Sequence, residues 1–325
     1  IASKHPTPEQ RPRFTQVTTF DEGDTVQRVL AERGQILPTH ALKDAEWTLA
    51  NQEMGNLLDK LKNSGTPLRK YINGKFYAGI KSGYNEAFLI DDEKRRELIK
   101  EDPNSEQLIK PYLRGRDIKR WNVLYNYQEY IIFVPRGTNI NNYPSIYNHL
   151  MEYKDNLLKK AGGNQWYELA SASHHSDFSK PKIVYPDIAK SSYFAVDSNG
   201  LYVDMTAFFI PTSELYLLGI LNSLVSRYFI IYISSTLRGN FVRLKSQYVS
   251  QIPIPNASEG LRGRIATLAQ QCLDATAKGA PVAPLEAELN ALVYEAYGLT
   301  ADEIAIIESG TGSSSQPTHP SDEEL

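Results

Sequence analysis

Short apolar runs of the kind that form β-strands lie between helical stretches through the middle of this chain, and this mixture limits its fold more than any other feature. The runs are rich in β-branched and aromatic residues, and turn formers bound them. The turn Ser198-Asn199-Gly200 stands between two runs and predicts a hairpin. The sequence therefore predicts an α+β fold, with a mixed domain of β-sheet and flanking helices. The expected strands lie at residues 130–135, 182–188, 193–197 and 201–210.

Helices are expected between these strands. Asp91 can cap a helix over residues 92–100, and Ser213 can cap a longer helix over residues 214–234. A short helix is also expected near residues 25–33, and another ends near residue 62, where Ser-Gly-Thr-Pro breaks it.

The pattern of apolar residues changes from strand-like to helical after the segment Gln251-Ile-Pro-Ile-Pro255. Apolar residues recur at helical spacing over residues 261–278, Pro284 begins a second helix, and Gly298 ends it. The mixed domain is thus expected to be followed by a C-terminal helical pair and a disordered acidic tail. The expected divisions are a lead-in at residues 1–50, the mixed domain at 51–258, the helical segment at 259–308 and the tail at 309–325.

Charge is unevenly distributed along the chain. The net charge is −3, but nine of the 38 acidic residues lie in residues 279–325, which leaves 29 against all 35 basic residues elsewhere, a net charge of +6. Residues 215–258 contain no Asp or Glu. Because electrostatic interactions act within about 8 to 10 Å at physiological salt, the charge of the whole chain does not exclude a nucleic-acid partner.

The composition excludes several other classes of protein. The single cysteine, Cys272, excludes a disulfide framework and a zinc site built on cysteines. No signal peptide opens the chain and no apolar run of about 20 residues occurs, so we expect a cytoplasmic protein with no membrane contact. The chain begins with Ile1 rather than Met, as expected for a piece of a longer protein.

Motifs for catalysis are absent from the sequence. A methyltransferase that acts on base amino groups needs an Asn/Asp-Pro-Pro-aromatic motif, and the chain contains no Pro-Pro pair. A Mg²⁺ nuclease of the common type needs Pro-Asp followed by Asp/Glu-x-Lys, and no lysine after Pro186-Asp187 fits. His174 and His175, with Asp177 nearby, fit a polar loop better than a metal site. We therefore expect the chain itself to catalyse no reaction.

A series of motifs occurs in a fixed order between residues 57 and 308. Residues 76–90 read Phe-Tyr-Ala-Gly-Ile-Lys-Ser-Gly-Tyr-Asn-Glu-Ala-Phe-Leu-Ile. This stretch resembles the opening of the TaqI-like C-terminal specificity domain, where Gly-Ile-Lys-Thr-Gly-x-Asn-x-Ala-Phe occurs; Ser82 replaces the threonine and keeps its hydroxyl. The resemblance continues through residues 109–120, 180–188, 206–211, 221–223, 238–243, 251–255 and 289–308.

The resemblance implies that this chain chooses the DNA sequence for a type IIG-like restriction-modification enzyme. The parent would be an adenine-specific DNA methyltransferase that uses S-adenosylmethionine, with or without a restriction endonuclease that uses Mg²⁺. No cofactor is implied for the chain itself. The implied partners are double-stranded DNA and the upstream methyltransferase domain of the same protein. The predicted helical segment also agrees with the helical spacers of similar type I specificity subunits.

DNA binding requires cations for phosphates and planar or amide side chains for base edges. A Gly-flanked loop at residues 81–85 allows the backbone to approach phosphate, and it fits a tight turn within the fold equally well. In a second, basic segment at residues 114–120, Asp117 can instead pair with an arginine, most readily Arg116. The candidates from these two segments are Lys81, Ser82, Tyr84, Asn85, Arg114, Arg116, Lys119 and Arg120.

A third basic segment follows a long apolar helix in the acid-free stretch. Its arginines have no carboxylate within fifteen residues in sequence, which favours contact with phosphate or guanine, although a distant carboxylate could fold onto them. A long polar loop, which includes residues 164–166, can carry further contacts. The candidates from the third segment and the loop are Arg238, Asn240, Arg243, Lys245, His174 and His175.

A second function remains open at this point. The chain could be a protein-interaction or regulatory module, in which the helical pair docks on a partner DNA methyltransferase and the basic stretch is merely solvated. Salt-sensitive binding to duplex DNA distinguishes the two functions.

Overall fold

The structure is a computed structural model that describes residues 13–14, 25–33, 35–36, 52–125, 128–162, 165–173, 175–234 and 241–312. Near the N-terminus, β1 (Arg13–Phe14) pairs antiparallel with β2 (Gln35–Ile36). The expected helix near residues 25–33 is confirmed as α1 (Val26–Arg33). The remaining lead-in residues and the tail at 313–325 lie outside the described part.

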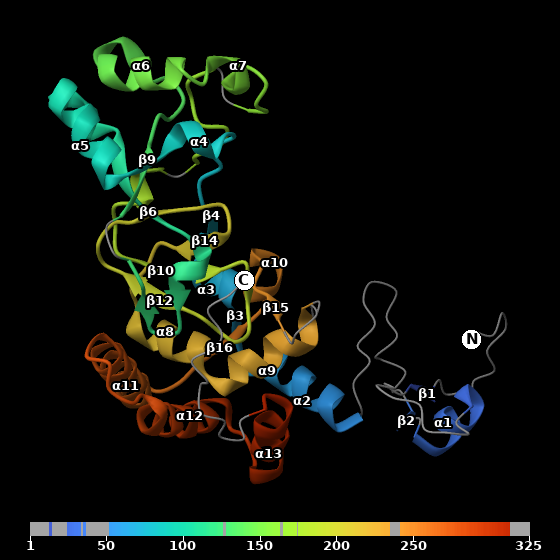
Figure 1. Ribbon diagram of the computed structural model, residues 1–325. Helices are drawn as coiled ribbons and strands as arrows, with labels where there is room; N and C mark the ends of the chain where they lie inside the picture. Colours follow the sequence, from blue (N-terminus) through green and yellow to red (C-terminus); the bar gives the residue numbers. More distant parts are fainter. Residues whose placement is uncertain are drawn as a thin grey trace.

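A four-stranded antiparallel sheet lies at the centre of the molecule (Figure 1). Its order is β12 (Ala195–Asp197), β10 (Lys182–Pro186), β14 (Ala207–Ile210) and β4 (Tyr77–Ala78). Successive side chains of a strand point to opposite faces, so Ile183 and Tyr185 enter one hydrophobic core and Val184 enters another. Both faces of this sheet are therefore covered.

A second sheet and short helices cover one face. The sheet order is β13 (Tyr202–Val203), β6 (Ile109–Leu113), β9 (Glu129–Ile132) and β5 (Leu89–Asp91), with β13 parallel to β6. Asp91 accepts a hydrogen bond from the backbone N–H of Lys94, which confirms it as the cap of the next helix. The helices of this part are α4 (Asn85–Phe88), α5 (Asp92–Glu101), α6 (Pro144–Met151) and α7 (Lys154–Leu157).

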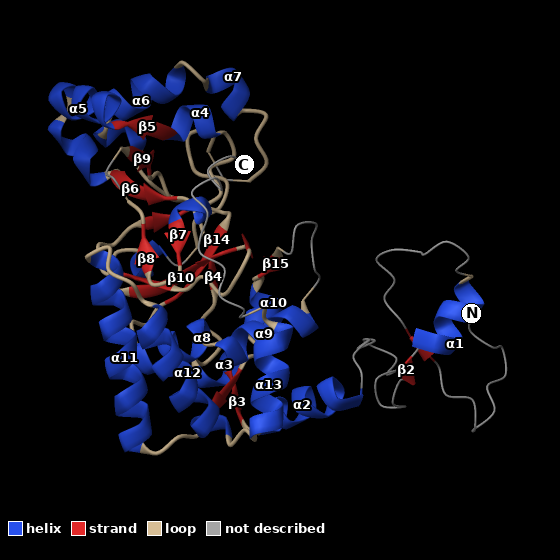
Figure 2. Ribbon diagram, turned by 60° about the horizontal axis from the view of Figure 1, so that its bottom comes forward, coloured by secondary structure: helices blue, strands red, loops and turns tan. Residues whose placement is uncertain are grey.

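Long helices cover the other face and share one core with it (Figure 2). The expected C-terminal pair is confirmed, and Gly298 ends its second helix in the left-handed conformation, with φ 61°. This part also contains a short ladder of β3 (Gly65–Pro67) with β16 (Pro253–Pro255). Its helices are α2 (Gln52–Asn63), α3 (Leu68–Tyr71), α8 (Leu215–Asn222), α9 (Leu224–Ile233), α11 (Glu259–Ala277), α12 (Ala283–Tyr297) and α13 (Ala301–Gly310).

These elements confirm the predicted α+β fold. Within the described ranges, no single helix is long and apolar enough to span a bilayer; only α8 and α9 taken together pass that test, and they are bent by 58° at their junction.

The hairpin predicted at Ser198-Asn199-Gly200 is wrong. β12 before this turn pairs with β10, whereas β13 after it pairs with β6 in the other sheet. The turn is closed by a side chain instead of a strand ladder, because the Asp197 carboxylate accepts hydrogen bonds from the backbone N–H groups of Asn199 and Leu201. The chain therefore crosses from one sheet to the next at this turn.

The single helix predicted over residues 214–234 is also wrong. Ser213 caps nothing, and the segment divides into α8 and α9 at Ser223, whose backbone is extended. Ser223 Oγ accepts from the N–H of Ser226, and the Asn290 side chain on α12 accepts from the N–H of Leu224 at 2.8 Å. These two acceptors satisfy the start of α9 and allow the bend.

Helix α13 is among the helices that were not predicted. Thr300 and Glu303 form a reciprocal capping box at its start, a pattern that the sequence contains. The helix runs to Gly310, past the expected start of the tail, and Thr311 after it is buried.

Candidate nucleic-acid interface

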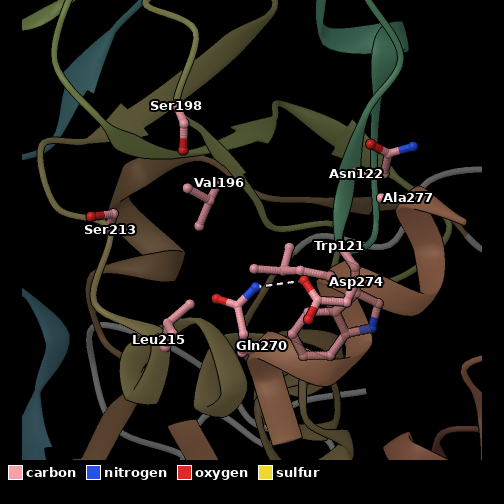
Figure 3. Close-up of a pocket in the computed structure, with 10 residues that line it drawn as sticks. Trp121, Asn122, Val196, Ser198, Ser213, Leu215, Gln270, Asp274 and Ala277 are labelled. Atoms are coloured by element: carbon pink, nitrogen blue, oxygen red, sulfur yellow. Dashed lines mark hydrogen bonds between the residues drawn. The ribbon is translucent and has the colours of Figure 1, made fainter. Parts of the chain in front are cut away.

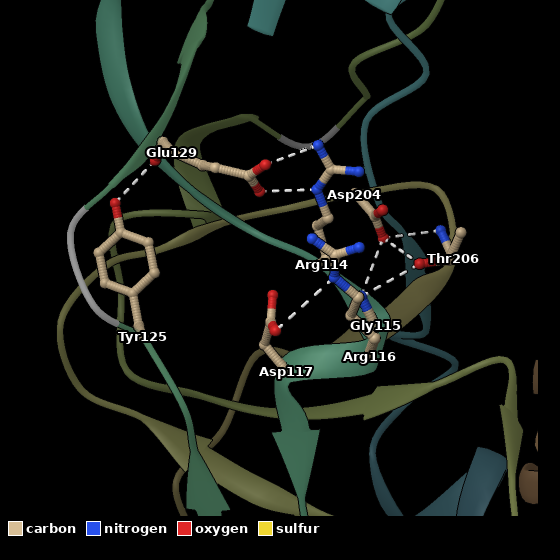
Figure 4. Close-up of polar contacts among 8 residues, drawn as sticks. All are labelled: Arg114, Gly115, Arg116, Asp117, Tyr125, Glu129, Asp204 and Thr206. Carbon is tan, nitrogen blue, oxygen red and sulfur yellow. Dashed lines mark hydrogen bonds and ion pairs between the residues drawn. The ribbon is translucent and has the colours of Figure 1, made fainter. Parts of the chain in front are cut away.

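A tight turn formed by Asp204, Met205 and Thr206, here called the 204–206 turn, joins β13 to β14. The Asp204 carboxylate accepts hydrogen bonds from the backbone N–H of Thr206 at 2.8 Å and of Gly115 at 3.3 Å (Figure 4). It also accepts from the Thr206 hydroxyl at 2.5 Å. Burial raises the pKa of Asp204, and these hydrogen bonds oppose the shift. The turn is thereby fixed in one conformation.

Two glycines allow other segments to approach this turn. A Cβ atom on Gly79 would lie 1.8 Å from the Asp204 carbonyl oxygen, and one on Gly115 would lie 2.5 Å from that of Thr206. Neither position has room for a side chain. The loop before Lys81 and the basic segment around Arg114 therefore meet at the 204–206 turn.

Lys81 lies where the first candidate loop meets the polar loop. The N–H of Ile80 donates to the Val203 carbonyl, and Lys81 and Ser171 exchange backbone hydrogen bonds of 2.9 and 3.0 Å. The polar loop that leads to the two candidate histidines thus passes beside Lys81. His174 lies outside the described residues, and of His175 only the backbone, at the start of the 3-10 helix η5 (His175–Asp177), is described.

The other candidates of the first loop divide into fixed and exposed side chains. Ser82 is buried, and its hydroxyl donates to Asn85 Oδ1 at 2.6 Å. Tyr84 is half-buried, packs against Tyr153, and accepts a hydrogen bond from Asn156. Lys81 and Asn85 are exposed. The tight-turn interpretation fits Ser82, while Lys81 faces solvent.

Arg114 and Arg116 lie on either side of Gly115 and differ in their partners (Figure 4). Arg114 makes two hydrogen bonds, of 2.6 and 2.7 Å, to the Glu129 carboxylate, and these bonds raise its pKa. The side chain of Arg116 is 68% exposed, and its Nε lies 3.9 Å from Asp117. The expected pairing of Arg116 with Asp117 is thus a distant one, and Arg114 holds the close ion pair.

Arg120 lies away from the turn, in a hairpin of β7 (Ile118–Lys119) and β8 (Asn122–Val123). Its Nε lies 2.9 Å from Glu286 on α12, its guanidinium donates to the Asn222 carbonyl, and burial lowers its pKa. Trp121 has a positive φ of 67° and donates from Nε1 to the same carboxylate. Arg120 therefore joins the hairpin to the helices, while Lys119 before it is exposed.

The third basic segment is linked to the 204–206 turn through Asp187, whose carbonyl accepts from the N–H of Leu244. β15 (Val242–Arg243) pairs with β11 (Ile188–Ala189), and the N–H of Asp187 donates to the Thr206 carbonyl at 2.8 Å. A distant carboxylate does reach Arg243, since Asp187 lies 3.8 Å from it, yet the arginine side chain is 33% exposed. Lys245 is half-buried at the start of α10 (Ser246–Val249). Arg238 and Asn240 lie outside the described residues.

Sequence reasoning missed Met205 and Ile188. Met205 is 57% exposed and Ile188 is 43% exposed. Both lie in runs that were interpreted as continuous strands. The pattern Asp204-x-Thr206 inside such a run is the signal that could have revealed a turn, because an Asp side chain can bond to the backbone two residues ahead.

A hollow of about 490 Å³ lies elsewhere, between α11 and the edge of the central sheet (Figure 3). Its lining holds the carboxylate of Asp274, which accepts from Gln270, and includes no lysine or arginine. Such a lining does not suit phosphate. Among the residues that the structure describes, no group of three His, Cys, Asp or Glu side chains could hold a metal ion.

Comparison with known proteins identifies the kind of domain. Residues 110–254 match the family model of the TaqI-like C-terminal specificity domain. The type II methyltransferase M.PaeR7I of Pseudomonas aeruginosa is 25% identical over 79% of this chain and 44% of its own length. M.BstVI of Geobacillus stearothermophilus is 20% identical over 81% of this chain and 46% of its own. The chain thus spans less than half the length of these relatives.

A similar fold occurs in a solved structure. The type IIL restriction-modification enzyme MmeI, in complex with DNA, superposes with a TM-score of 0.58 at 14% identity, over 74% of this chain and 35% of that one. The resemblance drawn from the motifs is confirmed: residues 110–254 match the specificity-domain family, and the 204–206 turn lies within the matched segment.

Proposed function

We propose that this chain reads the target sequence on double-stranded DNA for a restriction-modification methyltransferase. The observation that supports it is the meeting of three segments, distant in sequence, at the 204–206 turn. Each segment carries a basic side chain that is exposed or partly exposed to solvent: Lys81, Arg116 and Arg243. Cations spaced around a fixed turn suit the phosphates of a duplex, and the turn itself can then face the bases.

Under this function, this chain recognises the DNA sequence and the rest of such a protein carries out catalysis. The relatives are type II methyltransferases of about twice this length, so methyl transfer to adenine and the S-adenosylmethionine site are assigned to an upstream domain. Mg²⁺ would be needed only by an added nuclease. This chain would catalyse no reaction and would act in the cytoplasm, with residues 51–258 as the recognition domain and residues 259–308 as the helical segment.

Duplex binding by the whole chain tests the proposal. Fluorescence anisotropy with short random-sequence duplexes, at several salt concentrations, should show affinity that falls steeply with salt. Lys81→Ala and Arg243→Ala should each reduce the slope of log K against log salt by about 1. Lys100→Ala, at an exposed position on α5, is the matched control and should leave the slope unchanged.

Two outcomes would contradict the DNA-reading function. If the chain is folded but binds no duplex, or if the two slopes equal that of the unmodified protein, the DNA-reading function is excluded. Salt-insensitive binding to a DNA methyltransferase domain would then favour the interaction module.

A further inference from the structure

Met205 is an apolar side chain that the fold holds out into solvent. Among the described residues, six large hydrophobic side chains are exposed, and two of them, Met205 and Ile188, lie near one hydrogen bond. That bond joins the N–H of Asp187, just before Ile188, to the carbonyl of Thr206, just after Met205. Exposed apolar groups gathered at one place indicate a contact surface more strongly than single scattered ones.

The exposure of Met205 cannot be relieved by movement of its backbone. Asp204 and Thr206 on either side are held by hydrogen bonds to Gly115 and Asp187, and Gly79 lies against the Asp204 carbonyl. The Asp204 N–H also donates to the Leu113 carbonyl at 2.9 Å. The turn is therefore preorganised, and a partner that covers Met205 loses little conformational entropy.

The charges around Met205 indicate which partner fits. Arg243 pairs with Ile188 in the β11–β15 ladder, and Lys81 follows Ile80, which bridges to Asp204. A duplex whose phosphates meet these cations brings a groove to the turn between them. In the major groove the apolar group on offer is the C5 methyl of thymine.

We propose that Met205, supported by Ile188, contacts a thymine methyl group in the major groove and so contributes to the choice of target sequence. The inference rests on the proposed function and adds a specificity-determining residue to it. Met205 carries no charge, so its contribution differs from that of Lys81 and Arg243 in being insensitive to salt.

The first test uses the unmodified chain to select its preferred duplex from a random library and then measures affinity for that duplex. Met205→Ala should weaken binding about tenfold, or about 1.4 kcal/mol, with the salt slope unchanged. Met205→Leu should keep most of the affinity. Met151→Ala is the matched control, because this methionine is 38% exposed on α6, away from the turn, and its loss should have no effect.

The second test removes the methyl group from the DNA. Replacing each thymine of the selected duplex by deoxyuridine should weaken the unmodified protein at one position, and this loss should not add to that of Met205→Ala. Full affinity in Met205→Ala, or additive losses at every thymine, would overturn the inference while leaving DNA reading intact. A rise in 2-aminopurine fluorescence on binding would overturn it too, since it marks insertion between base pairs. If the unmodified chain selects no duplex, the proposed function itself is contradicted.

Discussion

Lys182 and Asp197 form an ion pair at the centre of the molecule, with neither side chain exposed to solvent. Lys182 also donates to the carbonyl of Phe178, and Asp197 accepts from the N–H groups of Asn199 and Leu201. Burial lowers the pKa of Lys182, and Asp197 opposes this shift. The pair thus ties β10 to the turn after β12 and to the end of the polar loop.

Lys182→Met should strongly destabilise the protein, because it leaves the carboxylate of Asp197 buried without a counter-charge. We expect a loss of about 3 to 5 kcal/mol in the free energy of unfolding, measured by urea titration. Lys180→Met is the control, since Lys180 is 61% exposed and its pair with Asp177 should contribute less than about 1 kcal/mol. Equal losses in the two variants would contradict a structural role for the buried pair.

Gly79→Ala tests the close approach at the 204–206 turn. The added methyl group has no space beside the Asp204 carbonyl, so the turn must shift, at an expected cost of about 1 to 3 kcal/mol. Affinity for duplex DNA should fall in the same variant. Gly263→Ala is the control, because open space surrounds Gly263 within α11, and it should stabilise the helix by about 0.5 to 1 kcal/mol. Unchanged melting and binding in Gly79→Ala would show that the approach is not required.

Elements with local signals could be predicted from the sequence. The helix after Asp91 begins with its own capping side chain, and α12 has Pro284 in its first turn and Gly298 as its C-terminal cap. Each signal lies within a few residues of the helix end that it specifies, so no tertiary contact is needed to recognise it.

Elements that depend on distant partners could not be predicted. The turn at residues 198–200 has the composition of a hairpin, but Asp197 holds it and is itself held by Lys182. The bend between α8 and α9 is supported by Asn290, 66 residues away from Leu224. Apolar periodicity continues through the α8–α9 junction and gives no sign of the bend, and the composition of the turn at residues 198–200 does not show that the strands on either side pair in different sheets.

The same limit applies to the candidate interface. The sequence identified the basic segments, but not which arginine is engaged. Arg114 meets Glu129, fifteen residues away, and Arg120 meets Glu286 on a distant helix. A basic segment in the sequence therefore predicts a basic surface. Which of its arginines are instead engaged in ion pairs follows only from the fold.

Arg114 and Arg116 should respond oppositely to substitution. Arg114→Ala removes two charge-assisted hydrogen bonds from Glu129 and should lower the free energy of unfolding by about 1 to 3 kcal/mol. Arg116→Ala should leave stability within about 0.5 kcal/mol and reduce the salt slope of DNA binding by about 1. Thermal unfolding and anisotropy on both variants check this. A slope change only in Arg114→Ala would reverse the assignment.

Stability should depend on pH through Glu303, which joins α13 to α2. Burial acts to raise the pKa of Glu303, but hydrogen bonds from Lys60 and Thr300 outweigh it, so its pKa lies below the ordinary 4.5. A depressed carboxyl pKa contributes stability that is fully present above 4.5 and is lost as the pH falls through the folded value.

Glu303→Gln should therefore be less stable than the unmodified protein at pH 7, by about 1 kcal/mol, because its capping box is weakened. The difference should shrink as the pH falls below 4.5, since both side chains are then neutral. Urea unfolding across this range measures it. Lys60→Met should lose only the share of this pH dependence that Lys60 contributes, as its ammonium group lies 2.5 Å from Glu303 while the hydrogen bonds from Thr300 remain. A difference that stays constant with pH would assign the effect to packing alone.

Glu286 is the point at which the β7–β8 hairpin and the C-terminal helices depend on each other. Its carboxylate lies 2.9 Å from Arg120 Nε and accepts from Trp121 Nε1. Glu286→Gln keeps an acceptor for the indole but leaves the largely buried guanidinium without a counter-charge, at an expected cost of about 3 kcal/mol in urea unfolding. Glu288→Gln, exposed on the same helix, should stay within about 0.5 kcal/mol.

Removing the arginine as well should restore part of this loss. In the double variant Arg120→Met with Glu286→Gln neither member of the pair is charged, so the two losses should not add, and the coupling should exceed about 1 kcal/mol. Arg120→Met alone should leave the salt slope of DNA binding unchanged, because Arg120 lies against α12 rather than at the 204–206 turn. If the losses of stability were additive and the salt slope were reduced, Arg120 would be a DNA-binding residue, as the sequence alone predicts.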